Sequence, residues 1–569
     1  MGDAWERAEA LSATALLNCL LREVAEAAGE DGGRLVHRLP ATGRLLRTRP
    51  GRHPTGPELR TRDGWRPLPL EGLVDVASAE LTARTGVTAS GLPAEIADSR
   101  DVLAALLEAR EHAPPPADPY LRSEQALVAG HRHHPAPKTR GGGPPESWLP
   151  YAPEAHTSFP LTLLAVRADL LAGEGDTAVL GRLYPNVPEG YRVLPAHPWQ
   201  LALLGDLPAF HDGRLLCLGR TAERAVPTAS LRTVYLPEAD LFLKFSLDVR
   251  ITNDVRRLWR HDLRWLGPVD EVLRAVPEAD VLSDRGYRTA ALGGRDAYEA
   301  LAVLVREGFG ARLRPGLTPL LAAAVAEGYE GSPLAAPGLT AEGALAWWEA
   351  YLRQVVPPVL HAYLRHGVVL ECHLQNVLVA VDADGLPGQA LFRDLEGVKL
   401  IGERHRELLR RHALPDAPGP GVDAARGWER LVYCLVTNNL MEIAGAVAEP
   451  HPGLAPVLWA RARRFLQEWS AGHGDPAPLR GLLAAPHIPA KTNLLLRWTE
   501  ADGAAARYRP LPNPLRPRGG EATGFGFGSG SGSGSDSDSG SDSGSGELRA
   551  AVPREPVAPP GGPRPAESS

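Results

Sequence analysis

Two apolar, strand-like runs separated by a Gly/Pro-rich turn constrain the fold of this chain more than any other feature. The first run covers Gly367–Val381 and the second covers Gln389–Phe392. The turn between them predicts an antiparallel hairpin in which the second strand returns beside the first. This pairing would carry Asp394 back beside His373 and Asn376.

The predicted hairpin concentrates acidic, basic and amide side chains between its apolar runs. Alternation along an extended strand places Glu371, His373 and Gln375 on one face, and Cys372 and Leu374 on the other. Carboxylates suit Mg²⁺ together with phosphate oxygens, while imidazole, guanidinium and amide groups suit the phosphates themselves. The pattern therefore indicates a site for a phosphate and its metal. A satisfied polar network in an ordinary hairpin is the alternative interpretation.

Length and composition limit the class of protein. A chain of 569 residues exceeds one hydrophobic core, so we expect two or three domains that share a cleft. A net charge of -7 and a pI of about 6.2 argue against nucleic acid as a partner. We expect no signal peptide and no membrane-spanning helix. The cysteines lack a CxxC spacing, which fits a reduced cytoplasm, and they are Cys19, Cys217, Cys372 and Cys434.

Local patterns predict a mixed α+β chain in four parts. Residues 1–119 are mixed but helix-weighted, 120–265 are rich in strands, 266–518 are mainly helical around the hairpin, and 519–569 form a disordered Gly/Ser/Asp and Pro-rich tail. Helices are expected at 5–28, 99–112, 297–307, 343–366 and 428–447, and strands at 161–166, 191–194, 214–218, 232–236 and 240–245, with a strand pair near 65–76.

A loop rich in histidine and basic residues follows the first of these parts. The run Gly130–Gly142 contains His131, His134, Lys138 and Arg140 among glycines and prolines that exclude a helix interior. We interpret it as an anion-binding loop. Zinc binding is a second possibility, although no cysteine lies near and the cations would repel a metal ion. A merely solvated basic loop is the third.

A second group of hydroxyls and cations lies around a predicted strand. Ser230, Arg232 and Thr233 precede it, Lys244 lies inside it, and Arg256 follows. Lysine is rare in this arginine-dominated chain, so a lysine inside an apolar strand suggests a point charge directed at a phosphate. Exposed strands often carry lysine, however, and an SxRT pattern alone is weak.

Two further motifs have simpler explanations. The turn His197-Pro-Trp-Gln200 is interpreted as packing around an aromatic side chain. Lys491 and Arg497 lie on a strand-like run near the end of the chain, where a solvated face is the default interpretation.

Taken in this order, the motifs resemble those of the NRPS-independent siderophore synthetases, the aerobactin synthetase (IucA/IucC) family. Arg132 and His133 stand where proline and an apolar residue are usual. The matching motifs are GHxxHPxxKxRxG at Gly130, HPWQ at His197, SxRT at Ser230, LKFSL around Lys244, ITNxxR at Ile251, ExHxQN at Glu371 and RDxE at Arg393, with a KxxxxxR echo at Lys491.

The resemblance implies an ATP-dependent ligase that converts a polycarboxylic acid such as citrate into an acyl-adenylate, releases pyrophosphate and passes the acyl group to an amine or hydroxyl. It also implies a cupped-hand fold of thumb, sheet-bearing fingers and a palm with distant kinase likeness, usually as a homodimer. ATP and Mg²⁺ would be the cofactors, without nucleic acid or membrane partners.

Roles for individual residues follow from the same resemblance. Lys244, Arg256, His373 and Arg232 would be catalytic, and all four would contact ATP as well. The full ATP-binding set would be Ser230, Arg232, Thr233, Lys244, Arg256, His373, Gln375 and Asn376; the metal ligands would be Glu371 and Asp394; the carboxylate substrate would meet His131, His134, Lys138 and Arg140.

Two other functions remain open at this level. An Asn followed by a metal-binding Asp on paired strands also describes a kinase-like phosphotransferase, which would release ADP, although no GxGxxG loop is present. A non-catalytic binder of iron or its chelates could use the histidine loop without consuming ATP. The sequence does not identify the carboxylate or its acceptor.

Overall fold

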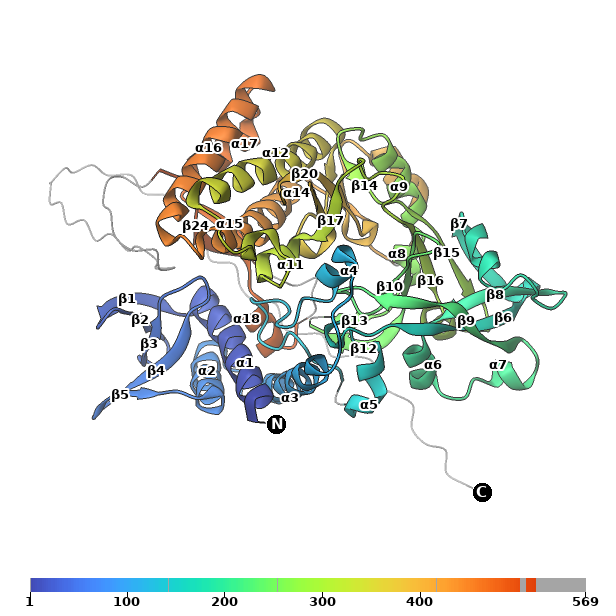
Figure 1. The fold of residues 1–569 in the computed structure, drawn as a ribbon, viewed down its shortest axis with the longest axis horizontal. Helices are drawn as coiled ribbons and strands as arrows, with labels where there is room; N and C mark the ends of the chain where they lie inside the picture. The colour runs from blue at the N-terminus through green and yellow to red at the C-terminus, as the bar shows by residue number, and fades with distance from the viewer. Residues whose placement is uncertain (1, 142, 253, 416, 502–507, 518–569) are drawn as a thin grey trace, which may run out of the picture. The chain divides into compact units, whose positions relative to one another are not determined.

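The computed structural model describes residues 2–141, 143–252, 254–415, 417–501 and 508–517 (Figure 1). The tail predicted to be disordered, 519–569, lies outside these residues. The described chain mixes helices with sheets that are antiparallel except for two short parallel pairs, β14–β20 and β21–β22. This confirms the mixed helix and sheet composition expected from the sequence.

The N-terminal part combines helices with a five-stranded antiparallel meander (Figure 1). Its elements are α1 Gly2–Glu23, β1 Glu26–Asp31, β2 Arg34–Arg38, β3 Leu45–Arg49, β4 Thr55–Thr61, β5 Gly64–Pro67, α2 Leu70–Thr85 and α3 Leu92–Glu111. The helix expected over 5–28 ends at Glu23, and residues 70–76 are helical rather than a strand. The reason is that the buried Leu70, Leu73, Ala77 and Leu81 recur at helical spacing.

An eight-stranded antiparallel sheet follows, in the order β7-β15-β16-β11-β10-β9-β6-β8. The five single strands predicted between residues 161 and 245 are present, but β15 and β16 lie beyond residue 265, so the sheet continues past the expected end of the sheet-rich part. Its strands are β6 Phe159–Arg167, β7 Leu171–Gly175, β8 Tyr191–Ala196, β9 Leu215–Pro227, β10 Thr233–Leu236, β11 Leu241–Phe245, β15 Asp284–Ala290 and β16 Val303–Glu307.

The helix expected at 297–307 is wrong over its second half. A short helix, α10 (Arg295–Ala300), ends before β16 begins. Val303 and Val305 pack into one apolar cluster and Leu304 into another. Opposite packing of successive residues is the period of a strand, and pairing with β11 and β15 on both sides stabilises it.

One row of cross-strand neighbours runs through five strands of this sheet. Thr233 pairs with Lys244, Lys244 with Leu304, Leu304 with Tyr287, and Tyr287 with Glu174. Directly paired residues in a sheet project to the same face. These side chains therefore share one face of the sheet.

The remaining described chain is built around the long helix α12 (Ala341–His366) and a four-stranded sheet in the order β14-β20-β19-β17. The predicted hairpin is confirmed, because β19 (Val377–Val381) pairs antiparallel with β20 (Pro387–Phe392). The helices expected at 343–366 and 428–447 are also present. The second consists of α14 Ala424–Val432, a π-helical turn Tyr433–Leu440 and α15 Met441–Ala448.

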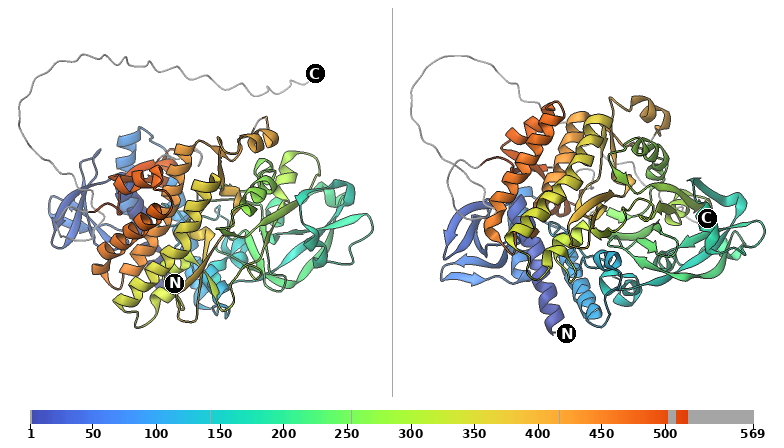
Figure 2. Two further views of the ribbon diagram at one scale, coloured as in Figure 1. Left: turned by 90° about the horizontal axis from the view of Figure 1, so that it is seen from above. Right: turned by 45° about the horizontal axis from the view of Figure 1, so that its top comes forward.

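Helix α12 packs beside α16 (Figure 2). The other elements complete this framework. They are α4 Pro119–Glu124, α5 Pro145–Trp148, α6 Pro198–Leu204, α7 Pro208–His211, β12 Leu247–Ile251, β13 Asp254–Arg256, α8 Arg260–Leu263, α9 Leu266–Arg274, β14 Asp280–Val281, β17 Thr318–Leu321, α11 Ala322–Glu327, β18 Val368–Val369, β21 Lys399–Ile401, α13 Arg406–His412, β22 Gly421–Val422, α16 Ala455–Gly472, α17 Ala477–Ala484, β23 His487–Lys491, α18 Asn493–Trp498 and β24 Tyr508–Pro512.

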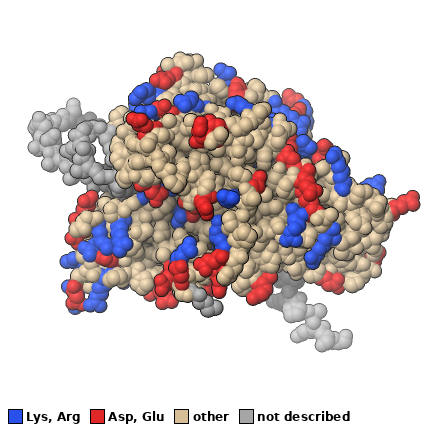
Figure 3. Space-filling view, viewed as in Figure 1, with Lys and Arg blue, Asp and Glu red and all other residues tan. Residues whose placement is uncertain are grey.

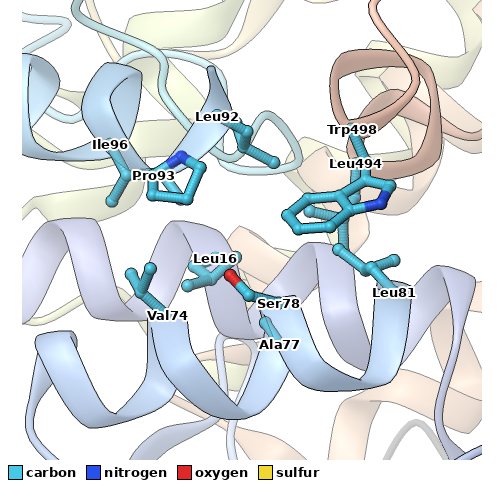
Figure 4. A pocket seen from close by; sticks show the side chains of 10 residues that line it. All are labelled: Leu16, Val74, Ala77, Ser78, Leu81, Leu92, Pro93, Ile96, Leu494 and Trp498. Carbon is cyan, nitrogen blue, oxygen red and sulfur yellow. The ribbon is translucent and has the colours of Figure 1, made fainter. Parts of the chain in front are cut away.

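The late helix α18 packs into the N-terminal part. Leu494 and Trp498 join an apolar cluster with Leu16, Leu81 and Ile96 from α1, α2 and α3 (Figure 4). The cavity between them is only about 10 Å³. It is too small for a substrate such as ATP or citrate.

One stretch, residues 424–448, is apolar and long enough to cross a membrane by composition alone. In the structure, 72% of its apolar window is buried. It therefore has the burial of a core helix.

Basic and acidic side chains are interspersed on the face shown in Figure 3, without a large single-sign patch.

Candidate active site

Lys244 is the centre of a buried ion-pair cluster between the eight-stranded sheet and the predicted hairpin. It lies in β11, where every residue is buried, and only 3% of it is exposed. Its Nζ donates to Asp394 Oδ1 at 2.7 Å and to Glu396 Oε2 at 2.6 Å. The structure thus joins two predicted site residues, Lys244 and Asp394, across 150 positions of sequence.

The two acids follow directly after the second strand of the hairpin. Arg393 N donates to the Asn376 carbonyl at 3.0 Å. This bond connects the end of β20 to the turn Leu374–Asn376, which precedes β19. Asp394 then adopts a left-handed backbone conformation with φ 77°, which aspartate tolerates better than most residues. Leu395 N, donating to Asp284 Oδ2 at 3.1 Å, fixes the 3₁₀ turn Leu395–Gly397 that presents Glu396.

Two arginines also approach the carboxylates of the cluster. Arg306 Nη2 is 3.4 Å from Asp394 Oδ1, and Arg232 Nη2 is 3.7 Å from Glu396 Oε2. Burial raises the pKa of Asp394, but Lys244 and Arg306 outweigh it and hold that pKa well below its usual range. Lys244 and Arg232 likewise hold the pKa of Glu396 low against burial. Both acids are therefore ionised at neutral pH.

The predicted phosphate-binding residues lie beside this cluster. Arg232 Nη1 donates to the Arg256 carbonyl at 3.0 Å, and Thr233 Oγ1 donates to Ser230 Oγ at 3.2 Å. Arg256 Nη2 donates to the Ile251 carbonyl at 2.7 Å. Burial, and then the charge of Arg232, lower the pKa of Arg256 to about 10. Two neighbouring guanidinium groups suit a polyanion.

The segment around His373 differs from the predicted extended strand. β18 ends at Val369, and Leu374–Asn376 form a 3₁₀ turn before β19 begins. The alternation that was expected to place Glu371, His373 and Gln375 on one face therefore does not apply. Asn439 Nδ2 donates to the Cys372 carbonyl at 2.9 Å, which holds the chain out of a strand ladder.

The turn nevertheless keeps several predicted residues together. His373 Nε2 lies 3.5 Å from Glu371 Oε1 and 3.3 Å from Asn376 Nδ2. Gln375 Nε2 donates to the Ala229 carbonyl at 3.3 Å, next to Ser230. Burial lowers the pKa of His373, against the charges of Glu371 and Asp394. His373 is therefore neutral at pH 7 and offers one N–H donor.

The predicted metal ligands have different partners in the structure. Arg430 Nη2 donates to Glu371 Oε2 at 2.6 Å, while Asp394 shares Lys244 with Glu396. Among the described residues, no three His, Cys, Asp or Glu side chains gather as a metal site. Mg²⁺ commonly uses only one or two carboxylates together with substrate phosphates. The neighbouring carboxylates of Asp394 and Glu396 fit that pattern, and Glu371 stays a predicted ligand.

Lys138 and Arg140 of the histidine loop are buried against an acid that the sequence interpretation missed. Lys138 Nζ donates to Glu154 and to the Leu127 carbonyl, the latter at 2.6 Å, and Arg140 Nη2 donates to Glu154 Oε1 at 3.2 Å. His134 is buried, whereas His131 is exposed. Arg140 Nε and Glu154 Oε2 lack a hydrogen-bond partner among the described residues. The loop therefore has a structural core of its own, and its substrate contacts stay predictions.

The two unusual residues of this loop attach it to distant helices. Arg132 forms a two-pronged contact with Glu327 of α11, at 3.1 and 2.7 Å. His133 Nε2 lies 3.0 Å from Glu442 Oε1 of α15 and 2.6 Å from Arg22 Nη2 of α1. Arg132 and His133 thus bind α1, α11 and α15 to the loop.

Four residues that pair with predicted site residues were not predicted from the sequence: Glu396, Arg306, Arg430 and Glu154. Glu396 had a local signal, since it lies two residues after Asp394 in the RDxE motif. Arg306 had none, because it lies within a run that was assigned to a helix. His197 is buried and caps α6 by accepting from Trp199 N at 3.2 Å, as the packing interpretation of that turn requires.

Two family models match this chain. Residues 119–327 match the model of the IucA/IucC family, and residues 345–506 match a model described as ferric iron reductase FhuF-like transporter. The first match contains the histidine loop and Lys244. The second contains the hairpin and Glu396.

Curated relatives extend over most of the chain. An L-2,3-diaminopropanoate–citrate ligase of Staphylococcus aureus is 30% identical over 439 residues, covering 70% of this chain and 75% of the relative. A spermidine–citrate ligase of Bacillus anthracis is 27% identical, covering 70% and 73%. The solved structure of ATP-bound aerobactin synthetase IucA from Klebsiella pneumoniae has a TM-score of 0.76 at 23% identity, over 89% of this chain and all (100%) of that one.

The fold is thus the mixed helix and sheet fold of that synthetase. The chain belongs to the IucA/IucC family of siderophore synthetases.

Proposed function

We propose that this protein is an ATP-dependent ligase of siderophore biosynthesis, which activates citrate or a citrate derivative and condenses it with an amine or hydroxyl. The observation that carries the proposal is the Lys244 cluster, where cations from the sheet meet two ionised acids from the hairpin. It is supported by relatives named as citrate ligases at up to 30% identity.

The reaction has two steps that need no nucleophilic side chain. A carboxylate oxygen of the acid attacks the α-phosphorus of ATP, the bond to the bridging oxygen breaks, and pyrophosphate leaves. The acceptor nitrogen or oxygen then attacks the acyl carbon, the bond between that carbon and the phosphate oxygen breaks, and AMP leaves. The acceptor loses one proton.

Cationic and amide groups of the chain stabilise the charge that develops on the α-phosphoryl group. Lys244, Arg232 and Arg256 supply fixed cations, and His373 supplies a hydrogen-bond donor. Ser230, Thr233, Gln375 and Asn376 would orient the triphosphate. His131, His134, Lys138 and Arg140 would face the carboxylate substrate.

Mg²⁺ would be held by Asp394 with either Glu396 or Glu371, and it would neutralise phosphate charge. In the structure both Asp394 and Glu396 contact Lys244. Phosphate oxygens would offer Lys244 a third anionic partner, which would free carboxylate oxygens for the metal. The finer features expected of the family also belong to the proposal: a cupped hand with a kinase-like palm, a homodimer and a cytoplasmic location.

The proposal is tested by incubating the full chain with ATP, Mg²⁺, hydroxylamine and a panel of carboxylates. We expect hydroxamate from citrate or a close derivative, with one AMP and one pyrophosphate per hydroxamate. Stoichiometric ADP would instead support a kinase-like phosphotransferase. Iron-chelate binding without nucleotide turnover would support a non-catalytic binder.

A further inference from the structure

A polar groove of about 750 Å³ lies beside the edge strand β7 of the eight-stranded sheet. Its lining includes none of the residues predicted to bind ATP, the metal or the carboxylate substrate. Its polar side chains come from β7, from α8 and the residue after it, from β15 and from α10, and they are Glu174, Arg260, Arg264, Tyr287 and Tyr298.

The groove opens on the same face of the sheet as Lys244. Tyr287 and Glu174 belong to the cross-strand row that contains Lys244 and Leu304. Tyr287 packs in the same apolar cluster as Leu304, while Val305 packs in the opposite one. Tyr287 is two strands from Lys244, which corresponds to about 10 Å. An acyl group attached to a phosphate that is bound beside Lys244 would occupy much of that distance.

Helix α8 lies between the groove and the Lys244 cluster, because Asp262 in this helix is close enough to Glu396 and Lys244 for their charges to shift its pKa. Arg260 and Arg264 line the groove. The next helix, α9, packs against the turn Leu395–Gly397, which carries Glu396. A molecule in the groove is therefore only one short helix away from the reaction centre.

The groove presents both signs of charge in a polar frame. Arg264 Nε lies 3.9 Å from Glu174 Oε1, and these side chains are 47% and 51% exposed. Such a contact is weak in water, so both groups can exchange it for a ligand. The Arg260 guanidinium lies 5.1 Å from the centre of the Tyr298 ring. The hydroxyls of Tyr298 and Tyr287 lie 3.0 Å apart and add hydrogen-bonding groups.

From this arrangement, and on the basis of the proposed function, we infer that the groove binds the α-amino-acid head group of the acceptor amine. Arg260 and Arg264 bind its carboxylate, and Glu174 binds its ammonium group. Arginine suits the carboxylate because its fork of N–H donors matches two oxygens. The second amine of the acceptor then extends past α8 toward the acyl-adenylate.

The test compares two acceptors that differ by one carboxylate, L-2,3-diaminopropanoate and ethane-1,2-diamine, with citrate, ATP and Mg²⁺ held constant. We expect the KM of the wild-type protein to be at least about tenfold lower for the diamino acid, since a hydrogen bond to a charged group contributes roughly tenfold or more. Arg264→Gln should raise the KM for the diamino acid roughly 10- to 100-fold, with kcat nearly unchanged. It should leave the KM for the diamine and for hydroxylamine unaltered.

Arg182→Gln is the matched control, because Arg182 is an exposed arginine outside the groove. It should change neither KM. Equal KM values for the two acceptors in the wild-type protein, or an equal rise for both in Arg264→Gln, would overturn the inference.

A binding measurement separates this inference from the proposed function. Titration calorimetry of L-2,3-diaminopropanoate into the wild-type chain and into Arg264→Gln needs no turnover. Heat that is lost in the variant supports the groove, whereas no binding to the wild-type chain contradicts it. Failure to form hydroxamate or AMP with any carboxylate would instead contradict the proposed reaction.

Discussion

A buried lysine held by two carboxylates is costly unless all three charges are paired. Lys244 is almost fully buried and contacts Asp394 and Glu396, which Arg306 and Arg232 also approach. Buried ionic groups are weak evidence of stabilisation by themselves, since apolar residues of the same volume often do as well. Clusters of strongly shifted pKa values are typical of functional sites, which is the interpretation proposed here.

At the residue scale, Lys244→Ala and His373→Ala should each lower kcat for adenylation by about 10²- to 10³-fold. Both groups are proposed to stabilise charge that grows on the phosphoryl group. Lys244→Arg should recover only part of the loss, because a planar guanidinium replaces a compact ammonium. The measurement is citrate-dependent pyrophosphate release, with circular dichroism as a check of folding.

Removing Lys244 also leaves two adjacent carboxylates without their shared cation, so Lys244→Ala should lower the melting temperature more than His373→Ala. Folded variants of both residues with near-normal adenylation rates would rule out this active site.

At the scale of elements, the histidine loop is attached to α15 through Glu442. This carboxylate contacts His133 at 3.0 Å and Arg52 at 3.2 Å, and its side chain is 16% exposed. Burial raises the pKa of Glu442, but His133 and Arg52 outweigh it and hold that pKa well below its usual value. Glu449 also approaches Arg52, at 3.7 Å, but is 64% exposed.

Glu442→Ala should therefore lower the free energy of unfolding by about 3–5 kcal/mol, since it removes the carboxylate that pairs with Arg52 and approaches Arg22, whose side chains are each only 11% exposed. Glu449→Ala is the matched control and should lower it by less than about 1 kcal/mol. Urea unfolding followed by fluorescence measures both. Similar losses in the two variants would show that the buried contact does not anchor the loop.

At the scale of the whole molecule, buried histidines in several parts of the chain should make the protein sensitive to acid. Burial lowers the pKa of His37 and of His133 to about 4, and of His53 and His197 to about 3. In the unfolded state each of these histidines binds a proton near its usual pKa, about 6.5, whereas in the folded state it remains neutral to lower pH. Stability should therefore fall as the pH drops below about 6.5.

Each histidine should contribute up to about 2 kcal/mol of this loss at about pH 5. Glu23 offsets the contribution of about one histidine. Burial raises the pKa of Glu23 to about 7, so its protonation stabilises the folded state as the pH falls. His197→Asn keeps an acceptor for the α6 cap, so it should reduce the pH dependence of the urea midpoint between about pH 7 and about pH 5. A midpoint that is constant over this range in the wild-type chain would contradict the prediction.

The sequence by itself determined the features that depend on neighbours along the chain. The hairpin of β19 and β20, the helix Ala341–His366 and the strand around Lys244 follow from local periodicity and turn residues. The order of the motifs was enough to predict the family. Local periodicity failed where pairing with distant strands decided the outcome, as it did for β16.

Only the tertiary structure decided which charges meet. Lys244 and its carboxylates are separated by about 150 positions in the sequence. Glu154 contacts Lys138 of the histidine loop because the chain between them folds back. The row from Thr233 to Glu174 likewise combines five strands in an order that differs from their sequence order. The physical reason is that burial and charge pairing depend on spatial distance, whereas sequence patterns report only the local backbone and the face that each segment buries.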